Sequence, residues 1–304
     1  MSKSILIAGA TGLVGEKLVE KLLADGHQVA ILSRKPKSRS GVKVFLWDVY
    51  QQTIDNSAFS GIDTVINLTG EGIADKPWTN ERKQQLIDSR VKSAELIFKA
   101  IRETNATVKS YISASAVGYY GDRQDEILAE ESGIGKGFLA ECCLAWENAA
   151  DRGIALGIRV VKIRIGIVLS EKGGALQTMA KPIKYFAGAA LGSGQQWMPW
   201  IHIDDLTGIF TKAVNDKNMF DAYNATAPSP VTNQNFTKTL GKILHKPIWP
   251  FNAPAFALKK LLGEMSILPL MSTNTSAQKI LNTGFQFRYL DLEEALKAIY
   301  ERKQ

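Results

Sequence analysis

Short β-rich hydrophobic runs alternate with longer amphipathic segments through the first two thirds of the chain. In the amphipathic segments apolar residues recur every three or four positions, which places them on one face of a helix, whereas the short runs favour buried strands. This alternation predicts an α/β fold with a doubly wound parallel sheet covered by helices on both faces. The predicted strands are 4–8, 28–32, 43–46, 64–67, 110–114 and 159–165, and the helices among them are 13–24 and 80–103.

The pattern changes after about residue 170, where glycine and proline interrupt shorter segments, as in Gly173-Gly174 and Pro228-Ser-Pro230. Such punctuation is typical of turns between small elements. We therefore predict a first domain over 1–170 and a smaller, mostly helical substrate lobe over 171–304, interleaved because 197–226 returns to the first domain. The helices predicted in this part are 204–214, 233–244, 254–262 and 292–302, and a strand is predicted at 221–225 that rejoins the main sheet.

Length and hydropathy place the chain among ordinary globular proteins, since 304 residues with 45% hydrophobic content can bury a sizeable core. The longest apolar runs fall well short of the roughly 18 to 20 residues that span a bilayer. The start, Met-Ser-Lys-Ser, passes directly into the first predicted strand and does not resemble a signal peptide. We expect a cytoplasmic protein with no membrane partner.

Charge and cysteine content argue against several kinds of partner and site. The net charge is +7, but 37 basic residues are mixed with 30 acidic ones, which is typical of scattered surface lysine. No nucleic-acid recognition motif accompanies the charge, so no nucleic-acid partner is expected. Cys142 and Cys143 are adjacent, which disfavours a disulfide between them, and no metal-ligand spacing is present.

A glycine-rich loop, Gly9-Ala-Thr-Gly12-Leu-Val-Gly15, directly follows the first strand and opens the first helix. In this context the three glycines allow a tight turn, close approach to a pyrophosphate and close helix–strand packing, and the helix start offers free N–H groups to the anion. The sequence thus predicts a Rossmann-type dinucleotide site. Its predicted contacts from this loop are Gly9, Thr11, Gly12, Leu13, Val14 and Gly15.

The end of the second strand decides between NAD and NADP. An acidic side chain there would bind the ribose 2′-hydroxyl, but the residues are Ser33, Arg34 and Lys35. Arg34 offers a charged fork to a 2′-phosphate, Ser33 a hydroxyl and Lys35 a point charge. NADP(H) is the predicted cofactor, and Asp48 after the third strand is placed to meet the adenine amine.

Three further motifs carry a resemblance to a known family. They are Asn67-Leu-Thr-Gly70, Ser113-Ala-Ser-Ala-Val-Gly-Tyr-Tyr-Gly121 and Trp200-Ile-His-Ile-Asp-Asp-Leu206, in this order along the chain. Together with the glycine loop they resemble the extended short-chain dehydrogenase/reductases of the NAD-dependent epimerase/dehydratase family. With Gly284-Phe-Gln-Phe-Arg-Tyr289, the resemblance covers nearly the whole chain and narrows to an uncharacterised "epimerase family protein" subgroup that carries a short extra C-terminal domain.

This resemblance implies further cofactor contacts at the carboxyl ends of the strands. They are Leu68, Thr69, Gly70, Arg90, Ser113, Arg164 and Val168. Arg90 stands where the family often has an asparagine, and it is either a contact to pyrophosphate or substrate or an exposed helix arginine.

The family's catalytic Tyr-x-x-x-Lys pair lies on the helix after the serine motif, and here that helix reads Gly137-Phe-Leu-Ala-Glu-Cys-Cys-Leu-Ala-Trp-Glu147. Alignment on Glu147 places Leu139 at the tyrosine and Cys143 at the lysine, and neither residue can transfer a proton as that pair does. Catalytic candidates near the nicotinamide are Ser115, which holds the family's serine position, and Tyr119 and Glu141. Packing or surface roles are the alternatives for the last two.

Two functions remain open from the sequence. The first is an NADP(H)-dependent oxidoreductase or epimerase acting on a small carbonyl or sugar-like substrate. The second is an NADPH-bound sensor or scaffold without turnover. A homodimer is left open as well.

Overall fold

Strand β1 (Ser4–Ala8) shows how the sequence builds the centre of the molecule. Ile5 and Ile7 belong to one hydrophobic cluster and Leu6 and Ala8 to another, and all four are fully buried. Successive side chains of a strand point to opposite faces. A strand that is apolar at every position must therefore be covered on both sides, as the strands of parallel sheets are.

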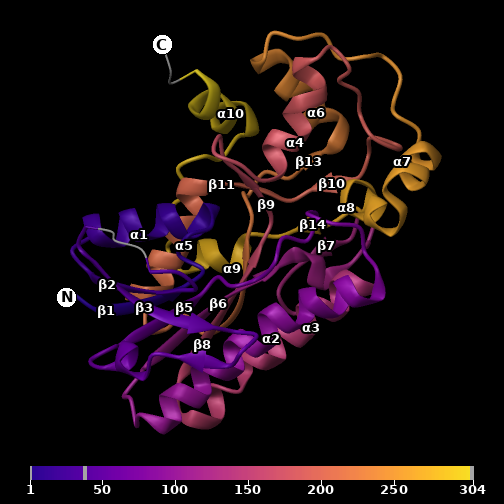
Figure 1. The fold of residues 1–304 in the computed structure, drawn as a ribbon. Coiled ribbons are helices and arrows are strands. Elements are labelled where there is room, and N and C mark those ends of the chain that lie inside the picture. The colour runs from indigo at the N-terminus through magenta and orange to yellow at the C-terminus, as the bar shows by residue number, and fades with distance from the viewer. Residues whose placement is uncertain (1, 37–39, 302–304) are drawn as a thin grey trace.

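The computed structural model describes residues 2–36 and 40–301. Its main sheet has eight strands in the order β12-β8-β6-β5-β1-β2-β3-β4, all parallel to their neighbours except β4. This confirms the predicted Rossmann-type doubly wound α/β fold (Figure 1). The strand bounds are β2 (Gln28–Ser33), β3 (Val42–Asp48), β4 (Thr53–Ile54), β5 (Thr64–Asn67), β6 (Ser110–Ala116), β8 (Arg159–Ile165) and β12 (Asp221–Ala225).

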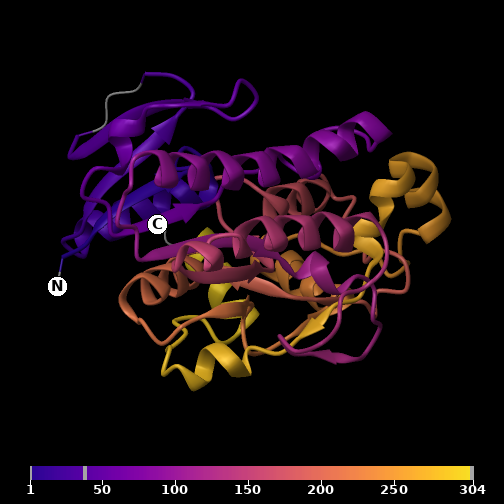
Figure 2. The same ribbon diagram turned by 90° about the horizontal axis from the view of Figure 1, so that it is seen from below.

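Helices cover both faces of the sheet. On one face α1 (Leu13–Ala24) contacts α5 (Ile203–Asn215), and on the other α2 (Asn80–Glu103) packs along α3 (Phe138–Asp151). Figure 2 shows the long helix α2 running beside α3. Each helix turns a stripe of buried apolar residues toward the sheet, as the three- and four-residue spacing predicts.

The order of the strands reverses between β1 and β5. From β1 the chain proceeds outward through β2 and β3, and it then returns to place β5 on the other side of β1. In open α/β sheets, ligands bind beyond the carboxyl ends of the strands at such a switch point. The glycine loop that follows β1 lies at this position.

A third hydrophobic cluster forms the core of a lobe beyond the carboxyl edge of the sheet. Its helices are α4 (Ala175–Lys184), α6 (Asn233–Ile243) and α10 (Leu292–Tyr300). The last predicted helix therefore ends at Tyr300, and Arg302 lies outside the described residues. Short strand pairs join the cluster, namely β9 (Ile167–Leu169) with β11 (Trp200–His202) and β10 (Trp197–Met198) with β13 (Val231–Thr232).

Later parts of the chain cross back onto the sheet. Strand β12 pairs with β8 as predicted, and α9 (Gln278–Asn282) packs against β12. Strand β14 (Asn274–Thr275) pairs with β7 (Ile127–Leu128), which follows the serine motif. Residues 203–225 and 274–282 thus lie against the main sheet and the segment after the serine motif, whereas 197–202, the start of the predicted returning segment 197–226, pairs with β9 and β13 at the C-terminal lobe. Within the described ranges, no helix is both long and apolar enough to cross a membrane.

Candidate functional site

The glycine loop between β1 and α1 has the geometry of an anion cradle. Gly9 has φ +79°, a conformation that other residues rarely adopt, and a side chain there would press on the backbone of Leu68. At Gly15 a Cβ atom would lie 2.3 Å from the carbonyl oxygen of Gly9. Gly12 has room for a Cβ, because its nearest neighbour would be that same oxygen at 3.5 Å. The fold therefore requires Gly9 and Gly15, whereas Gly12 leaves open space for a ligand.

The amino end of α1 presents its N–H groups to that space. Gly12 is the N-cap and provides no side-chain hydrogen bond, so the first-turn N–H groups, those of Leu13 and Val14 among them, are not capped by a side chain. A helix start carries about half a positive charge from the aligned peptide dipoles. Thr11 is exposed beside it. An anionic group such as a pyrophosphate fits this arrangement.

The end of β5 adds a buried polar atom that lacks a partner. The Oγ1 atom of Thr69 is buried and makes no hydrogen bond within the described part of the chain. Its backbone N–H donates to Asn67 Oδ1 at 3.0 Å, and Asn67 is itself held by Ser93 and Tyr111. Buried hydroxyl groups are usually hydrogen-bonded, so an unpaired one beside the glycine loop fits a missing ligand. These residues therefore fit a dinucleotide.

At the end of β2, Arg34 is exposed and is the side chain best placed to meet a phosphate. Ser33 is buried, and its hydroxyl donates to the carbonyl of Lys35 at 2.7 Å and accepts from the Lys35 N–H at 3.2 Å. The Ser33 hydroxyl therefore closes the turn, and its predicted contact to a 2′-phosphate stays a prediction. Arg34 and Lys35 are exposed at the tip of this turn.

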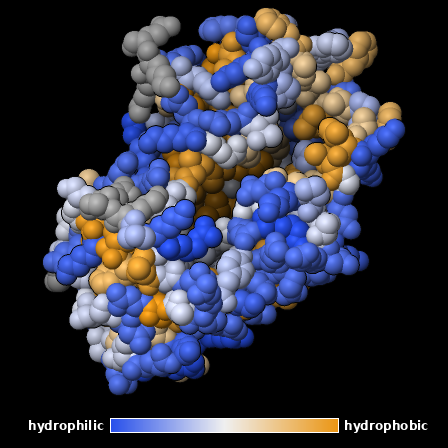
Figure 3. Space-filling view, viewed as in Figure 1, coloured by the Kyte–Doolittle hydropathy of each residue, from blue (hydrophilic) through white to orange (hydrophobic). Residues whose placement is uncertain are grey.

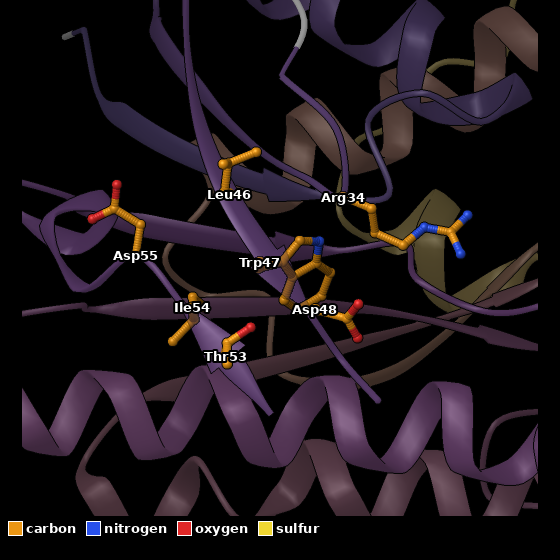
Figure 4. A pocket seen from close by; sticks show the side chains of 7 residues that line it. All are labelled: Arg34, Leu46, Trp47, Asp48, Thr53, Ile54 and Asp55. Atoms are coloured by element: carbon orange, nitrogen blue, oxygen red, sulfur yellow. The ribbon is translucent and has the colours of Figure 1, made fainter. Parts of the chain in front are cut away.

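A hollow of about 460 Å³ runs beside β3 and β4, and Figure 4 shows Arg34 and Asp48 at one end of it and Asp55 at the other. One carboxylate oxygen of Asp48 accepts the N–H groups of Tyr50 and Gln51, at 2.8 and 3.0 Å. Because this oxygen fixes the turn after β3, the second oxygen remains for the predicted contact with an adenine amine. That contact stays a prediction.

A cleft opens between the carboxyl edge of the sheet and the C-terminal lobe. Figure 3 shows it as a hollow whose floor is hydrophobic, near the start of α1 and β9. Val168 lies in β9, half-buried and paired with Ile201. Apolar clefts with a few polar groups suit small organic ligands. The described residues contain no group of three or more His, Cys, Asp or Glu side chains placed to bind a metal.

A buried ion pair lies beside the serine motif at 113–121. Arg164 donates from Nε and from a terminal nitrogen to the two carboxylate oxygens of Glu147, at 2.8 and 2.9 Å. Burial disfavours the charge on Arg164, but the hydrogen bonds and charge of Glu147 outweigh it and raise the pKa of the guanidinium above its usual value. Such fork-to-fork contacts are strong and directional.

The hydroxyl of Ser115 donates to the same Glu147 carboxylate at 2.7 Å, and the side chain of Ser115 is buried. Ser115 and Arg164 are opposite each other in the pairing of β6 with β8, which explains why both reach one carboxylate. This bond commits the hydroxyl to the interior and does not favour the predicted contact with a substrate carbonyl. Ser113, two residues earlier on the same face, is also buried, and its hydroxyl donates to the carbonyl of Ala114.

The two tyrosines of the motif differ in their hydrogen bonding. Tyr120 is fully buried, accepts from Arg164 at 2.9 Å and donates to Asn224 at 2.8 Å. Burial raises the pKa of Tyr120 to about 12. Tyr119 is half-buried, its ring lies 3.7 Å from the Arg164 guanidinium, and its hydroxyl has no hydrogen-bond partner among the residues that the structure describes. Tyr119 is therefore the phenol available to a ligand.

Helix α3 turns apolar groups toward the serine motif. Leu139 and Cys143 are the side chains nearest to Gly118, where a Cβ would lie 3.4 Å and 3.6 Å from them. Burial raises the pKa of the Cys143 thiol to about 12, so it is neutral at physiological pH. Glu141 lies exposed on the first turn of α3, and its predicted catalytic role stays a prediction.

Arg90 is half-buried and holds the loop after β5. Its two terminal nitrogens donate to the carbonyls of Leu86 and Glu71, at 2.7 and 3.1 Å, and its guanidinium stacks on Trp146. A Cβ at Gly70 would lie 2.9 Å from this guanidinium, so Gly70 and Arg90 approach closely. This half-buried position differs from the exposed helix arginine of one sequence-based alternative. The predicted contact of Arg90 to pyrophosphate or substrate stays a prediction.

Comparison with known proteins identifies the family of this chain. The model of the NAD dependent epimerase/dehydratase family matches residues 5–225, and a domain of unknown function, DUF1731, matches residues 253–299. This chain belongs to that epimerase/dehydratase family. Epimerase family protein YfhF of Bacillus subtilis is 36% identical, with 99% of each chain covered. These matches confirm the predicted family and the extra C-terminal domain.

Two solved structures match nearly the whole length of this chain. The human epimerase family protein SDR39U1, crystallised with NADPH, is 31% identical with a TM-score of 0.86, and the match covers 98% of this chain and 99% of the human one. A nucleoside-diphosphate sugar epimerase from Corynebacterium glutamicum is 33% identical with a TM-score of 0.81, and the match covers 100% of this chain and 59% of that one.

His202 before α5 and Asp205 in its first turn have structural roles in this family member. Asp205 is buried and accepts the N–H groups of Arg288 and Tyr289, at 2.7 and 3.1 Å. It thereby joins the motif at 200–206 to the motif at 284–289. His202 is the N-cap of α5, accepts from the Asp204 N–H at 3.1 Å and packs on Tyr289. Both motifs thus anchor the C-terminal domain to the sheet.

Sequence reasoning missed Glu147 and Asn224 as parts of the site. Glu147 served only as an alignment landmark, although a carboxylate on the inward face of an apolar helix is a signal, because buried charges are paired. Asn224 sits inside strand β12, fully buried, and its amide donates to the carbonyls of Leu128 and Ser276. Its contacts come from distant segments, so no local pattern could have revealed them.

Proposed function

We propose that this protein binds NADP(H) in the cradle at the start of α1. The observation that carries the proposal is the exposed guanidinium of Arg34 at the end of β2, where a carboxylate selective for NAD would otherwise stand. The uncapped start of α1 and the unpaired Oγ1 of Thr69 support the binding of a dinucleotide at the same edge. The NADPH in the structure of human SDR39U1 supports the choice of nucleotide.

Fluorescence titration with NADPH and NADH tests this proposal. Replacing Arg34→Ala should weaken NADPH binding by about 10- to 150-fold, because a charged hydrogen bond contributes about 1.5 to 3 kcal/mol, and should leave NADH binding nearly unchanged. Lys43→Ala is the matched control, since Lys43 is also an exposed cation, on the neighbouring strand β3. Equal losses for both nucleotides in Arg34→Ala would contradict the assignment.

We propose further that the bound nucleotide serves an oxidoreductase or epimerase reaction on a small carbonyl or sugar-like substrate in the cleft. NADPH, when bound, supplies a hydride to a carbonyl carbon. The chain must then supply or position the proton for the carbonyl oxygen. Tyr119 suits this role because its hydroxyl is unpaired among the described residues and it lies at the carboxyl end of β6, where the sheet edge meets the cleft.

A carbonyl library tests the reaction through the loss of nicotinamide absorbance. Tyr119→Phe should lower the rate at least 100-fold while NADPH affinity stays within twofold, because removal of a general acid typically costs 10²- to 10⁴-fold. Tyr300→Phe is a control, since it removes a phenol from the C-terminal lobe. A fully active Tyr119→Phe enzyme would exclude Tyr119 as the proton donor.

A second function is an NADPH-bound sensor or scaffold without turnover. The observation that favours it is the commitment of the Ser115 hydroxyl to Glu147, together with Leu139 and Cys143 on the face of α3 that meets Gly118. Tight NADPH binding with no oxidation across the library would support this alternative and contradict the enzyme. We propose a cytoplasmic location in either case, which cell fractionation tests.

A further inference from the structure

The C-terminal lobe carries an exposed aromatic surface beside three lysines, of which Lys259 and Lys260 are exposed and Lys246 is half-buried. Exposed fractions are 75% for Tyr185, 55% for Phe186, 60% for Trp249, 77% for Phe251 and 75% for Phe256. We define the basic aromatic patch as these five residues together with Lys246, Lys259 and Lys260. Large apolar side chains that gather on a surface usually mark a place of interaction.

Hydrogen bonds and a ring contact join two of the segments that form the patch. The indole N–H of Trp249 donates to the carbonyl of Phe186 at 2.8 Å, and Lys246 Nζ lies 4.0 Å from the centre of the Phe186 ring. The backbone of Trp249 also donates to Gly188 at 2.8 Å. The segments 185–188 and 246–249 therefore form one continuous surface, although nearly 60 residues separate them in the sequence.

Helix α7 (Ala255–Leu262) extends this surface and has no buried residue. Phe256, Lys259 and Lys260 are exposed on it, and Leu261 is 80% exposed. In Figure 3 hydrophobic and hydrophilic surfaces adjoin around α7, at the upper right of the molecule. An exposed helix with aromatic, leucine and lysine side chains is typical of an element that lies in a membrane interface.

The charge of the two segments that form this part of the lobe has one sign. Residues 172–203 and 222–263 contain eight lysines and no aspartate or glutamate, although Glu171, Asp204, Asp221 and Glu264 border these segments and Lys242 pairs with Glu293. Within the described part of the chain, no acidic side chain pairs with Lys246, Lys259 or Lys260. The partner that complements this surface is anionic.

We propose that the basic aromatic patch docks the protein peripherally on an anionic lipid surface. Tyrosine and tryptophan favour the headgroup level of a bilayer, where one end of the ring is apolar and the other wet. Phe251 and Phe256 enter the acyl boundary, and the lysines contact anionic headgroups. This binding departs from the sequence-based expectation of no membrane partner, because exposure and clustering of these side chains are tertiary properties.

Vesicle co-sedimentation of the full chain tests the proposal. Vesicles of phosphatidylglycerol and phosphatidylcholine should bind the protein at least tenfold more strongly than vesicles of phosphatidylcholine alone. Raising the salt from 50 mM to 500 mM should weaken binding severalfold, because screening shortens the range of the lysine charges. Equal binding to both vesicle types, or none to the anionic ones, would overturn the proposal.

Two double variants separate the apolar and the charged contributions. Phe251→Ser/Phe256→Ser and Lys259→Glu/Lys260→Glu should each lower binding to anionic vesicles at least tenfold, with melting temperatures near that of the wild type because the side chains are exposed. The matched control is Lys217→Glu/Phe220→Ser, an exposed lysine and an exposed phenylalanine in the turn before β12. It should bind as the wild type does.

Sedimentation velocity without lipid distinguishes a second copy of the chain as the occupant. A monomer that is unaffected by the patch variants supports lipid docking. A concentration-dependent dimer that Phe251→Ser/Phe256→Ser abolishes, combined with vesicle binding unchanged in that variant, would show that the patch pairs with another copy and would overturn the proposal.

Discussion

The two halves of the cleft edge differ in whether their polar groups have hydrogen-bond partners within the protein. Around β1 and β5 the donors are left unpaired, as the uncapped start of α1 and the Oγ1 of Thr69 show. Around β6 and α3 the polar groups satisfy one another, since Ser115 and Arg164 both bind Glu147. The first half therefore leaves donors available to a ligand, whereas in the second half the polar side chains mainly bind one another.

This difference indicates that nucleotide binding and the proposed reaction have separate structural requirements. Glycines and a helix start suffice for the first, because backbone N–H groups do the binding. Catalysis needs side chains whose protons are available at the cleft, and under the serine motif only Tyr119, among the described residues of that network, keeps a hydroxyl without a protein partner. Four experiments test this comparison.

The largest effect is expected from Glu147→Ala, which leaves Arg164 charged, buried and unpaired. Loss of one partner of a buried pair costs about 3 to 5 kcal/mol, and urea unfolding measures it. Glu141→Ala is the control on the same helix and should change the free energy of unfolding by less than about 0.5 kcal/mol, because Glu141 is exposed. Arg164→Met added to Glu147→Ala should recover part of the loss. A small change in the free energy of unfolding for Glu147→Ala alone would refute the view that Glu147 stabilises the buried charge of Arg164.

A second change separates two glycines of one loop. Gly15→Ala should destabilise the fold by about 3 kcal/mol, because the new methyl group would meet the Gly9 carbonyl 2.3 Å away. Gly12→Ala should leave the unfolding free energy within about 1 kcal/mol but weaken NADPH binding at least tenfold, since it fills the space left for a ligand. Thermal melting and NADPH titration measure the two quantities. Reversed effects would show that the open space at Gly12 is not a cradle.

A smaller effect is expected from Ser115→Ala. The variant loses one hydrogen bond to a charged group, which contributes about 1.5 kcal/mol to stability. NADPH affinity should stay within twofold, because the hydroxyl is buried and directed at Glu147. Urea unfolding and NADPH titration check both statements. A large drop in turnover at unchanged stability would instead restore Ser115 to the reaction.

The smallest effect concerns the cysteines of α3. Burial raises the pKa of Cys143 to about 12 and also raises the pKa of Cys142, so both thiols stay protonated at pH 8. Iodoacetamide reacts with the thiolate. Mass spectrometry should therefore find both cysteines unmodified in the native protein at pH 8 and both modified in urea. Rapid native labelling of Cys143 would show that α3 exposes a reactive group to the cleft.

Much of the fold follows from local pattern. The structure matches the predicted bounds of six elements, namely β1, β5, β8, β12, α1 and α2. Strongly apolar strands and amphipathic helices show their hydrophobic period within the local sequence. The short strand pairs of the C-terminal lobe, such as β9 with β11, were not predicted. A strand of two or three residues is too short to show a hydrophobic period. It is extended only because it pairs with a strand that is distant in the sequence.

The same division applies to the site. By itself, the sequence determined the glycine loop, the basic end of β2 and the missing tyrosine and lysine on α3, because each depends on residue types at fixed local spacing. Only the tertiary structure decided that Ser115 faces Glu147, that Arg90 braces Gly70 and that Trp249 meets Phe186. These contacts join segments that the sequence holds far apart, and a side chain's availability depends on which partner the folded chain brings to it.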